Sequence, residues 1–208
     1  LGEPGLVEGK GSNNWVISGE RTVSGKPLLA NDPHLGLGTP AIWFYAHLKS
    51  PEQNVIGATL PGMPLVVLGH NSHVAWGFTN TGPDVQDLYL EKINPANPSQ
   101  YQTPEGWQAF ETRQETIRVK GMADLPYTVR STRHGPVLSD AQSAHADIID
   151  TSKFVLALRW SALDVDNRTL VAGLRGSQAG NVSEFLEAFK DYHSPMQNVV
   201  VADVQGHI

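Results

Sequence analysis

The sequence predicts an α+β fold built mainly from antiparallel strands. Short apolar runs follow one another along the chain and are separated by turns rich in Gly, Pro and Asn. Only two segments show the 3.6-residue spacing of apolar side chains that is typical of helices. No internal repeat is visible, so the pattern does not indicate a solenoid or a propeller.

The expected strands come in two groups. The first group covers residues 14–19, 27–32, 54–62, 64–71, 73–80 and 86–93. The stretch 94–107 contains Pro, Gln and Gly, so we expect a loop there. The second group covers residues 111–121, 126–132, 154–160 and a last strand from residue 198. The pattern therefore indicates a fold in which sheets dominate.

Two helices are expected near the C-terminal end, at residues 167–176 and 183–192. In the second helix Ser183 is a suitable N-cap with Glu184 following it. Four apolar residues at helical spacing should share one face: Val182, Phe185, Leu186 and Phe189.

Composition excludes several classes of protein. With 208 residues, 40% of them hydrophobic, the chain has enough apolar side chains for a core. Its net charge of −6 and its lack of a basic run argue against nucleic acid as a partner. No apolar stretch approaches the roughly 18 to 20 residues of a membrane span, so no membrane association is expected. The absence of cysteine excludes disulfides and a thiol nucleophile.

The familiar catalytic motifs of serine hydrolases, nucleotide-binding proteins and zinc proteases are missing. His70 and His73 are three residues apart, which leaves a zinc site open but without a third ligand at suitable spacing. Residues 1–11 are rich in Gly and charged residues and read as a tail or linker. This tail meets an expected strand at Gly11-Ser12.

Several segments occur in an order that resembles the penicillin acylase family of N-terminal nucleophile hydrolases. These segments are SNNWV from Ser12, NDPHL from Asn31, GHN from Gly69, AWGFTN from Ala75 and MQNVVVADVQG around Asn198. The resemblance covers nearly all of residues 12–208. It implies an αββα sandwich of antiparallel sheets, present here only in part. It also implies that residues 1–11 end a spacer and that residues 12–208 begin a β-chain, whose partner is the α-chain of the same precursor.

The resemblance further implies a mechanism. Ser12 would attack the Gly11 carbonyl, and hydrolysis of the resulting ester would leave Ser12 with a free α-amino group. That group titrates at about 7.7 to 8.0, which suits a general base at neutral pH. Ser12 would then cleave an amide substrate through an acyl-enzyme, and no cofactor would be required. The resemblance implies that the backbone N–H of Asn80 and the side chain of Asn198 donate hydrogen bonds to the oxyanion. It also implies that His34 helps to position the α-amino group.

Other family features carry over to named positions. Leu35 and Leu68 would line the acyl pocket, although ordinary core leucines are an alternative. Asp84, Gln86 and Asp87 would contribute to a structural calcium site, with a solvated acidic loop as the alternative. Members are usually exported, so we expect a periplasmic or secreted protein. The substrate is expected to be a small amide, and penicillins, cephalosporins and acyl-homoserine lactones stay unseparated.

Two alternatives from other classes stay open. The chain could be a non-catalytic binding or structural domain with the same fold. It could also be a metal-dependent hydrolase that uses Asp32, His34, His70 and His73. The sequence ends within an expected strand, from which we expect a segment of a larger fold that needs a partner for stability or activity.

Overall fold

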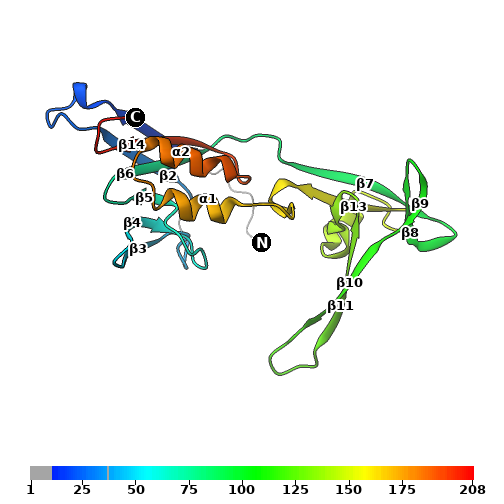
Figure 1. Cartoon of the computed structure of the whole chain (residues 1–208). Helices are drawn as coiled ribbons and strands as arrows, with labels where there is room; N and C mark the ends of the chain where they lie inside the picture. The colour runs from blue at the N-terminus through cyan, green and yellow to red at the C-terminus, as the bar shows by residue number, and fades with distance from the viewer. Residues whose placement is uncertain (1–10, 37) are drawn as a thin grey trace. The chain divides into compact units, whose positions relative to one another are not determined.

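The computed structural model describes residues 11–36 and 38–208 (Figure 1). Residues 1–10, which hold most of the predicted spacer end, lie outside the described residues. The chain divides into two compact units. Unit 1 combines the segment up to Pro83 with Asp166–Ile208, and unit 2 is Asp84–Val165. Among the described residues, no helix has the length and apolar character needed to cross a bilayer.

Unit 1 contains a five-stranded antiparallel sheet and a separate pair of strands. The sheet has the order β14 (Gln197–Asp203), β6 (Val74–Asn80), β5 (Leu68–His70), β4 (Asn54–Thr59) and β3 (Phe44–Lys49). The pair consists of β1 (Gly11–Ile17) and β2 (Leu28–His34), also antiparallel. All of these strands except β3 were expected from the sequence, so the predicted α+β class of antiparallel sheets is confirmed.

Two short helices complete unit 1. Helix α1 spans Thr169–Gly176 and α2 spans Val182–Ala188, followed by a 3₁₀ turn at Phe189–Asp191. The predicted N-cap Ser183 is wrong, because Asn181 Oδ1 accepts the Glu184 N–H at 2.9 Å. The Glu184 carboxylate accepts the Gly180 N–H at 2.7 Å in return. This reciprocal pattern resembles a capping box and starts the helix two residues earlier than Ser183 would.

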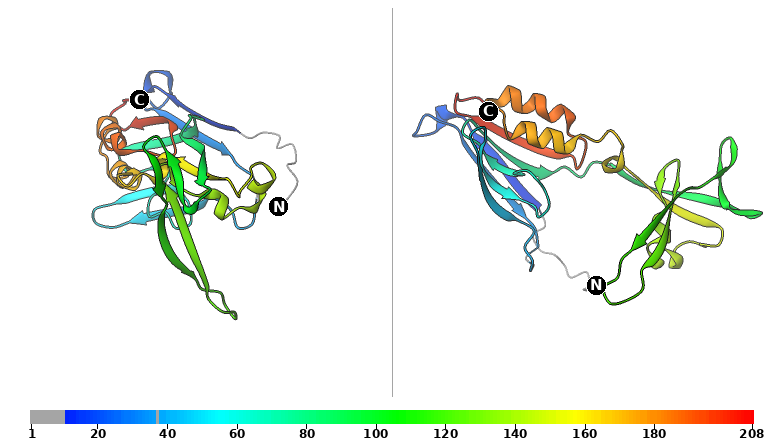
Figure 2. Two further views of the ribbon diagram at one scale, coloured as in Figure 1. Left: turned by 90° about the vertical axis from the view of Figure 1, so that its right-hand side faces the viewer. Right: turned by 60° about the horizontal axis from the view of Figure 1, so that its bottom comes forward.

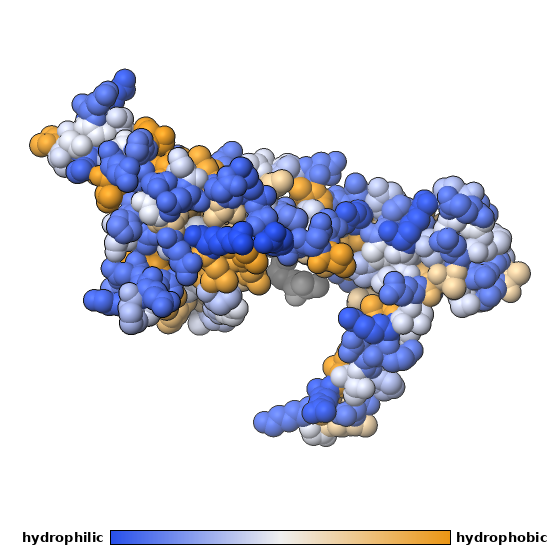
Figure 3. Space-filling model, in the orientation of Figure 1, coloured by the Kyte–Doolittle hydropathy of each residue, from blue (hydrophilic) through white to orange (hydrophobic). Residues whose placement is uncertain are grey.

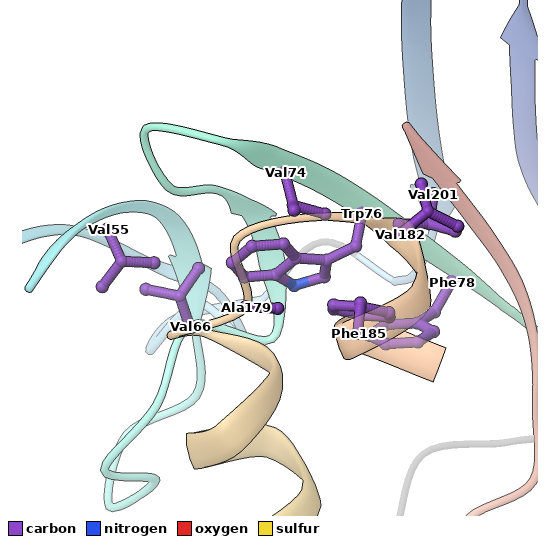
Figure 4. Close-up of a cluster of buried hydrophobic side chains, with 9 residues drawn as sticks. All are labelled: Val55, Val66, Val74, Trp76, Phe78, Ala179, Val182, Phe185 and Val201. Carbon is purple, nitrogen blue, oxygen red and sulfur yellow. The ribbon is translucent and has the colours of Figure 1, made fainter. Parts of the chain in front are cut away.

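The helices cover one face of the five-stranded sheet (Figure 2). Trp76 and Phe78 on β6 meet Phe185 on α2, with the Trp76 and Phe185 ring centroids 5.5 Å apart (Figure 4). The indole Nε1 of Trp76 donates to the Val67 carbonyl at 2.9 Å, so its polar group is satisfied inside the core. Leu186, which was expected to share a face with Val182 and Phe185, is 52% exposed and does not belong to the core. The core depends on Val182 and Phe185 instead.

The β1–β2 pair packs on β6 at Gly77. A Cβ at Gly77 would lie 2.7 Å from Cβ of Asn31 on β2, which is closer than atoms can approach without a shift. Trp76 and Phe78 face the helices, and side chains alternate along a strand, so Gly77 faces the opposite side. Unit 1 therefore has helices, a sheet and a second sheet as successive layers, which is the predicted sandwich in part.

Unit 2 is formed from strands alone, apart from 3₁₀ turns. One sheet has the order β13 (Phe154–Trp160), β7 (Gln86–Asn94), β8 (Asn97–Thr103) and β9 (Gly106–Ala109). The other contains β10 (Glu111–Ile117), β11 (Leu125–Thr132) and β12 (Gly135–Pro136). The β10–β11 hairpin has a mainly hydrophilic surface (Figure 3). The 3₁₀ turns of unit 2 are Leu138–Asp140, Ser143–Asp147 and Ser161–Leu163, and unit 1 has a further 3₁₀ turn at Gly19–Arg21.

The predicted loop at 94–107 is wrong, because the structure has β8 and β9 in this stretch. Tyr101 on β8 is buried and packs on Phe110 with ring centroids 5.1 Å apart. Its hydroxyl accepts the Arg133 N–H at 2.8 Å. A single buried tyrosine therefore anchors a hairpin whose other residues are mostly polar and exposed.

Candidate active site

The topology of unit 1 brings four strand ends together. Antiparallel pairing places Ser12, near the start of β1, opposite Pro33, near the end of β2. It also places Asn80, the last residue of β6, opposite Gln197, the first residue of β14. Because β1 and β2 pack on β6, these four ends lie at the same edge of unit 1. Ser12 thus lies close to residues that are 68 and 185 positions away from it in the chain, Asn80 and Gln197.

A cavity of about 300 Å³ opens at this edge. Four residues predicted from the sequence line it: Ser12, Leu35, Leu68 and Asn80. Most of the other lining residues are apolar or aromatic: Pro33, Ile42, Trp43, Leu60, Met63, Leu65, Val66, Val67, Trp76, Phe78, Phe185, Phe189, Tyr192 and Pro195. One hydroxyl nucleophile candidate therefore faces a largely apolar space.

Ser12 is the predicted nucleophile among the residues that line the cavity. Its hydroxyl donates to the Gly11 carbonyl oxygen at 2.8 Å. The Ser12 oxygen is thus beside the carbonyl group of the peptide bond that precedes it. Gly11 has no side chain, and among the described residues nothing lies within 4 Å of the place where a Cβ would be.

Asn198 and Asn80 each have a partner across the β6–β14 pair. Asn198 Nδ2 donates to Thr79 Oγ1 at 3.0 Å, which uses one of its two N–H groups. Gln197 Nε2 donates to Asn80 Oδ1 at 2.7 Å. Thr79 and Gln197 also line the cavity. Asn198 is not among the lining residues but is hydrogen-bonded to Thr79, which is. Thr79 and Gln197 were not predicted from the sequence. The register of β6 with β14 places Thr79 opposite Asn198 and Gln197 opposite Asn80.

His34 lies opposite Gly11 in the β1–β2 register. Its Nε2 is 2.8 Å from Oδ2 of Asp32, and both side chains are substantially exposed. His34 does not line the cavity. The backbone of His34 is therefore paired with Gly11, whereas its ring contacts the Asp32 carboxylate, and its predicted positioning role stays a prediction.

The aromatic wall of the cavity comes from the helical segment. Phe185 and Phe189 stack with ring centroids 4.4 Å apart, and Phe189 stacks on Tyr192 at 5.1 Å. Burial raises the pKa of the Tyr192 phenol, so it stays neutral at physiological pH. Phe185 and Phe189 were expected on one apolar face of a helix. Their second role at the cavity follows from tertiary packing and has no local sequence signal.

The ligand set of the metal-dependent alternative does not assemble. His34 contacts Asp32, whereas Nδ1 of His70 hydrogen-bonds the carbonyl of Asn71, which follows it in the chain. Across residues 11–36 and 38–208, no three His, Asp or Glu side chains come together as metal ligands. This geometry gives the metal-dependent alternative no support.

The predicted calcium residues lie in unit 2. Asp84, Gln86 and Asp87 are all exposed, and Gln86 and Asp87 are neighbours on β7, so their side chains point to opposite faces. Calcium prefers six to eight oxygen ligands, and these three residues alone supply too few. They do not form a complete site among the described residues, and the calcium site stays a prediction.

Comparisons with known proteins agree with this architecture. The family model described as penicillin amidase matches residues 3–208. The chain is 36% identical over 202 residues to the acyl-homoserine lactone acylase QuiP of Pseudomonas aeruginosa, covering 95% of this chain and 24% of that protein. It is 30% identical over 213 residues to the penicillin acylase 2 proenzyme of Pseudomonas sp. strain SE83, covering 100% of this chain and 26% of that protein.

A solved structure shows the same fold. The thermostable penicillin G acylase from Alcaligenes faecalis matches with a TM-score of 0.76 and 32% identity, covering 93% of this chain and 33% of that one. The chain spans about a quarter of the length of the curated relatives that it matches. The family model, the sequence relatives and the shared fold agree, and the chain therefore belongs to the penicillin amidase family.

Proposed function

We propose that this chain carries the nucleophile and oxyanion donors of an acylase that hydrolyses a linear amide bond through Ser12. The observation that supports this most strongly is the position of Ser12 at an apolar cavity beside Asn80. The relatives named as acylases support the same class of reaction. Because the chain spans only part of these relatives, the activity is proposed for the complete protein that contains it.

The first step of the proposal is self-cleavage between Gly11 and Ser12. The Ser12 oxygen attacks the Gly11 carbonyl carbon, the C–N bond breaks, and the nitrogen takes up a proton. Water then hydrolyses the ester, which leaves a carboxyl on Gly11 and a free α-amino group on Ser12. The 2.8 Å contact between the Ser12 hydroxyl and the Gly11 carbonyl oxygen supports this step, because the reacting groups are already adjacent.

The second step is amide hydrolysis by the new N-terminus. The α-amino group takes the hydroxyl proton of Ser12, whose oxygen attacks the substrate carbonyl carbon to form an acyl-enzyme and release the amine. Water then frees the acyl group as a carboxylic acid. The backbone N–H of Asn80 and the second Nδ2 hydrogen of Asn198 are the proposed donors to the oxyanion. The apolar cavity fits an apolar acyl group.

Three further expectations belong to this proposal. The α-chain of the same precursor completes the protein, calcium binds with the help of ligands beyond Asp84, Gln86 and Asp87, and the mature protein is periplasmic or secreted. Each follows from family membership.

The test is hydrolysis of an apolar acyl p-nitroanilide by the complete purified protein. We expect Ser12→Ala to abolish release of p-nitroaniline, whereas Ser18→Ala, at the half-buried N-cap of the 3₁₀ turn after β1, should leave the rate unchanged. Activity should persist in the presence of a chelator that removes transition metals. Activity that survives Ser12→Ala and is abolished by the chelator would favour the metal-dependent alternative instead. A folded protein without activity on any amide would favour a non-catalytic domain.

A further inference from the structure

Asn31 on β2 connects three strands through one side chain. Its Nδ2 donates to the Asn13 carbonyl at 2.8 Å and to the Phe78 carbonyl at 3.0 Å. Its Oδ1 accepts the Phe78 N–H at 2.9 Å. Since carbonyl oxygens only accept and an N–H only donates, this orientation of the carboxamide satisfies all three backbone groups. Asn31 thus links β1, β2 and β6.

Phe78 needs this partner because strand pairing on one side of β6 stops before it. The register of β5 with β6 runs from His70 opposite Ala75 to Gly69 opposite Trp76. Phe78 lies two residues farther along β6. The Asn31 carboxamide offers Phe78 both a donor and an acceptor, as a neighbouring strand would. Without Asn31, these buried peptide groups would lack a hydrogen bond.

Gly77 makes the contact sterically feasible. A Cβ on Gly77 would lie 2.7 Å from Cβ of Asn31 and 2.9 Å from its Oδ1. Any larger residue at 77 would push the Asn31 side chain away from β6. The sequence pair Asn31 and Gly77 therefore fixes how closely the β1–β2 pair approaches the sheet.

The residues held by Asn31 are close in sequence to the proposed catalytic groups. Asn13 directly follows Ser12, and Phe78 precedes Asn80 by two residues. A strand rises about 3.3 Å per residue. Ser12 is therefore one residue from Asn13, and Asn80 two residues from Phe78, the two residues whose backbone groups Asn31 binds. The other direct link near this point, from Asn14 Nδ2 to the Asn198 carbonyl, is longer at 3.4 Å.

We propose that Asn31 is a positioning residue that sets the separation between the Ser12 oxygen and the Asn80 N–H. This inference rests on the proposed function, because it assigns those two groups to one reaction. Asn31 does not touch the substrate and acts only through the strands it joins. A misplacement of about 1 Å between a nucleophile and its oxyanion donor can lower the rate by about 100-fold.

The experiment compares Asn31→Ala with Asn71→Ala in the complete protein. Asn71 makes an equally rich set of bonds at the opposite end of β6. Its Nδ2 donates to the carbonyls of Ser177 and Ala179, and its Oδ1 accepts from the N–H groups of His73 and Val74. Both substitutions should therefore lower the melting temperature. Only Asn31→Ala should affect the chemical step.

The measured quantities are kcat and KM for an apolar acyl p-nitroanilide, per titrated active site, and the melting temperature. We expect Asn31→Ala to lower kcat by about 10-fold to 100-fold with KM nearly unchanged. Asn71→Ala should leave both constants within about twofold of the starting protein. A kcat for Asn31→Ala that matches the starting protein, or an equal loss in both variants, overturns the inference.

Gly77→Ala provides a second perturbation that removes no hydrogen-bonding group. In the protein that keeps Asn31, Gly77→Ala should lower kcat, because the new methyl group displaces the Asn31 side chain. Asn31→Gly removes the Cβ at 2.7 Å as well as the carboxamide, so Gly77→Ala should cause no further loss when it is combined with Asn31→Gly. Additive losses overturn the inference. If Ser12→Ala stays active, the proposed function itself fails. If Ser12→Ala is inactive and both Asn31→Ala and Gly77→Ala are fully active, only the role of Asn31 fails.

Discussion

The hydrogen bond from Asn198 to Thr79 yields a prediction with a defined magnitude. Thr79→Val replaces the hydroxyl with a methyl group and so removes the acceptor for Asn198 Nδ2 at 3.0 Å. Thr79 is only 8% exposed, so water cannot easily replace the lost partner. The net value of such a bond is about 0.5 to 1.5 kcal/mol, which corresponds to about 2-fold to 13-fold in rate.

The loss should appear in kcat, because the Asn198 carboxamide is proposed to bind the oxyanion, which exists only after attack by Ser12. Asn198→Ala removes the donor completely and should cost about 100-fold to 1,000-fold. Thr79→Val only frees the carboxamide to rotate, so its effect should be smaller. KM should change little in both variants.

The assay is steady-state hydrolysis of an apolar acyl p-nitroanilide, normalised to the number of reactive Ser12 termini. Thr128→Val is the matched control, because it removes an exposed threonine hydrogen bond to Gln114 in unit 2. It should not alter kcat. In an Asn198→Ala background, Thr79→Val should have no additional effect. A Thr79→Val variant with full kcat, or with the same loss in both backgrounds, would contradict the proposed role of the hydrogen bond between Thr79 and Asn198.

Two further predictions concern stability. Phe185→Ala removes a fully buried ring and should reduce the free energy of unfolding by about 3 to 5 kcal/mol, measured by urea unfolding with near-UV circular dichroism. Leu186→Ala on the same helix should cost far less, and equal losses would contradict the assigned core. Burial alone would raise the pKa of Asp203, but hydrogen bonds from the backbone of Val182 and from His207 lower it to about 2. The stability that Asp203 contributes should be present above about pH 4 and lost as pH falls toward 2. Asp203→Asn should flatten this acid dependence, and an unchanged profile would contradict it.

Much of the fold could be predicted because its strands carry apolar periodicity. Strands β6 and β13 have long apolar runs, and both were expected at nearly their observed positions. Strand β3 was missed although Phe44 and Tyr45 are residue types that favour strands. Both side chains are exposed in the structure, and β3 pairs with β4 through the backbone. Strands β8 and β9 were missed because their mostly polar residues, with Pro98 among them, resemble a loop.

The helix boundaries show a different limit of sequence reasoning. Ser183 and Asn181 are both good N-caps, and Glu184 follows both. Only the spacing Asn181-x-x-Glu184 satisfies a capping box, and this spacing was available in the sequence. The exposure of Leu186, in contrast, depends on where α2 rests on the sheet, which no local pattern reports.

The family resemblance predicted individual residues of the candidate site but not the contacts between them. Ser12, Leu35, Leu68 and Asn80 were predicted one by one, and the fold brings them to one cavity. Their partners were not predicted. The roles of Thr79 and Asn31 depend on strand register and on the packing of one sheet against another, and these long-range contacts have no signature in a single sequence.

Self-cleavage at Gly11-Ser12 can be measured from the intact mass of the complete precursor. The purified precursor and its Ser12→Ala variant are incubated at neutral pH and analysed by mass spectrometry with N-terminal sequencing. We expect a fragment that begins at Ser12 in the first sample and none in the variant. An uncut chain in both samples, or the same cut in the variant, would contradict the mechanism.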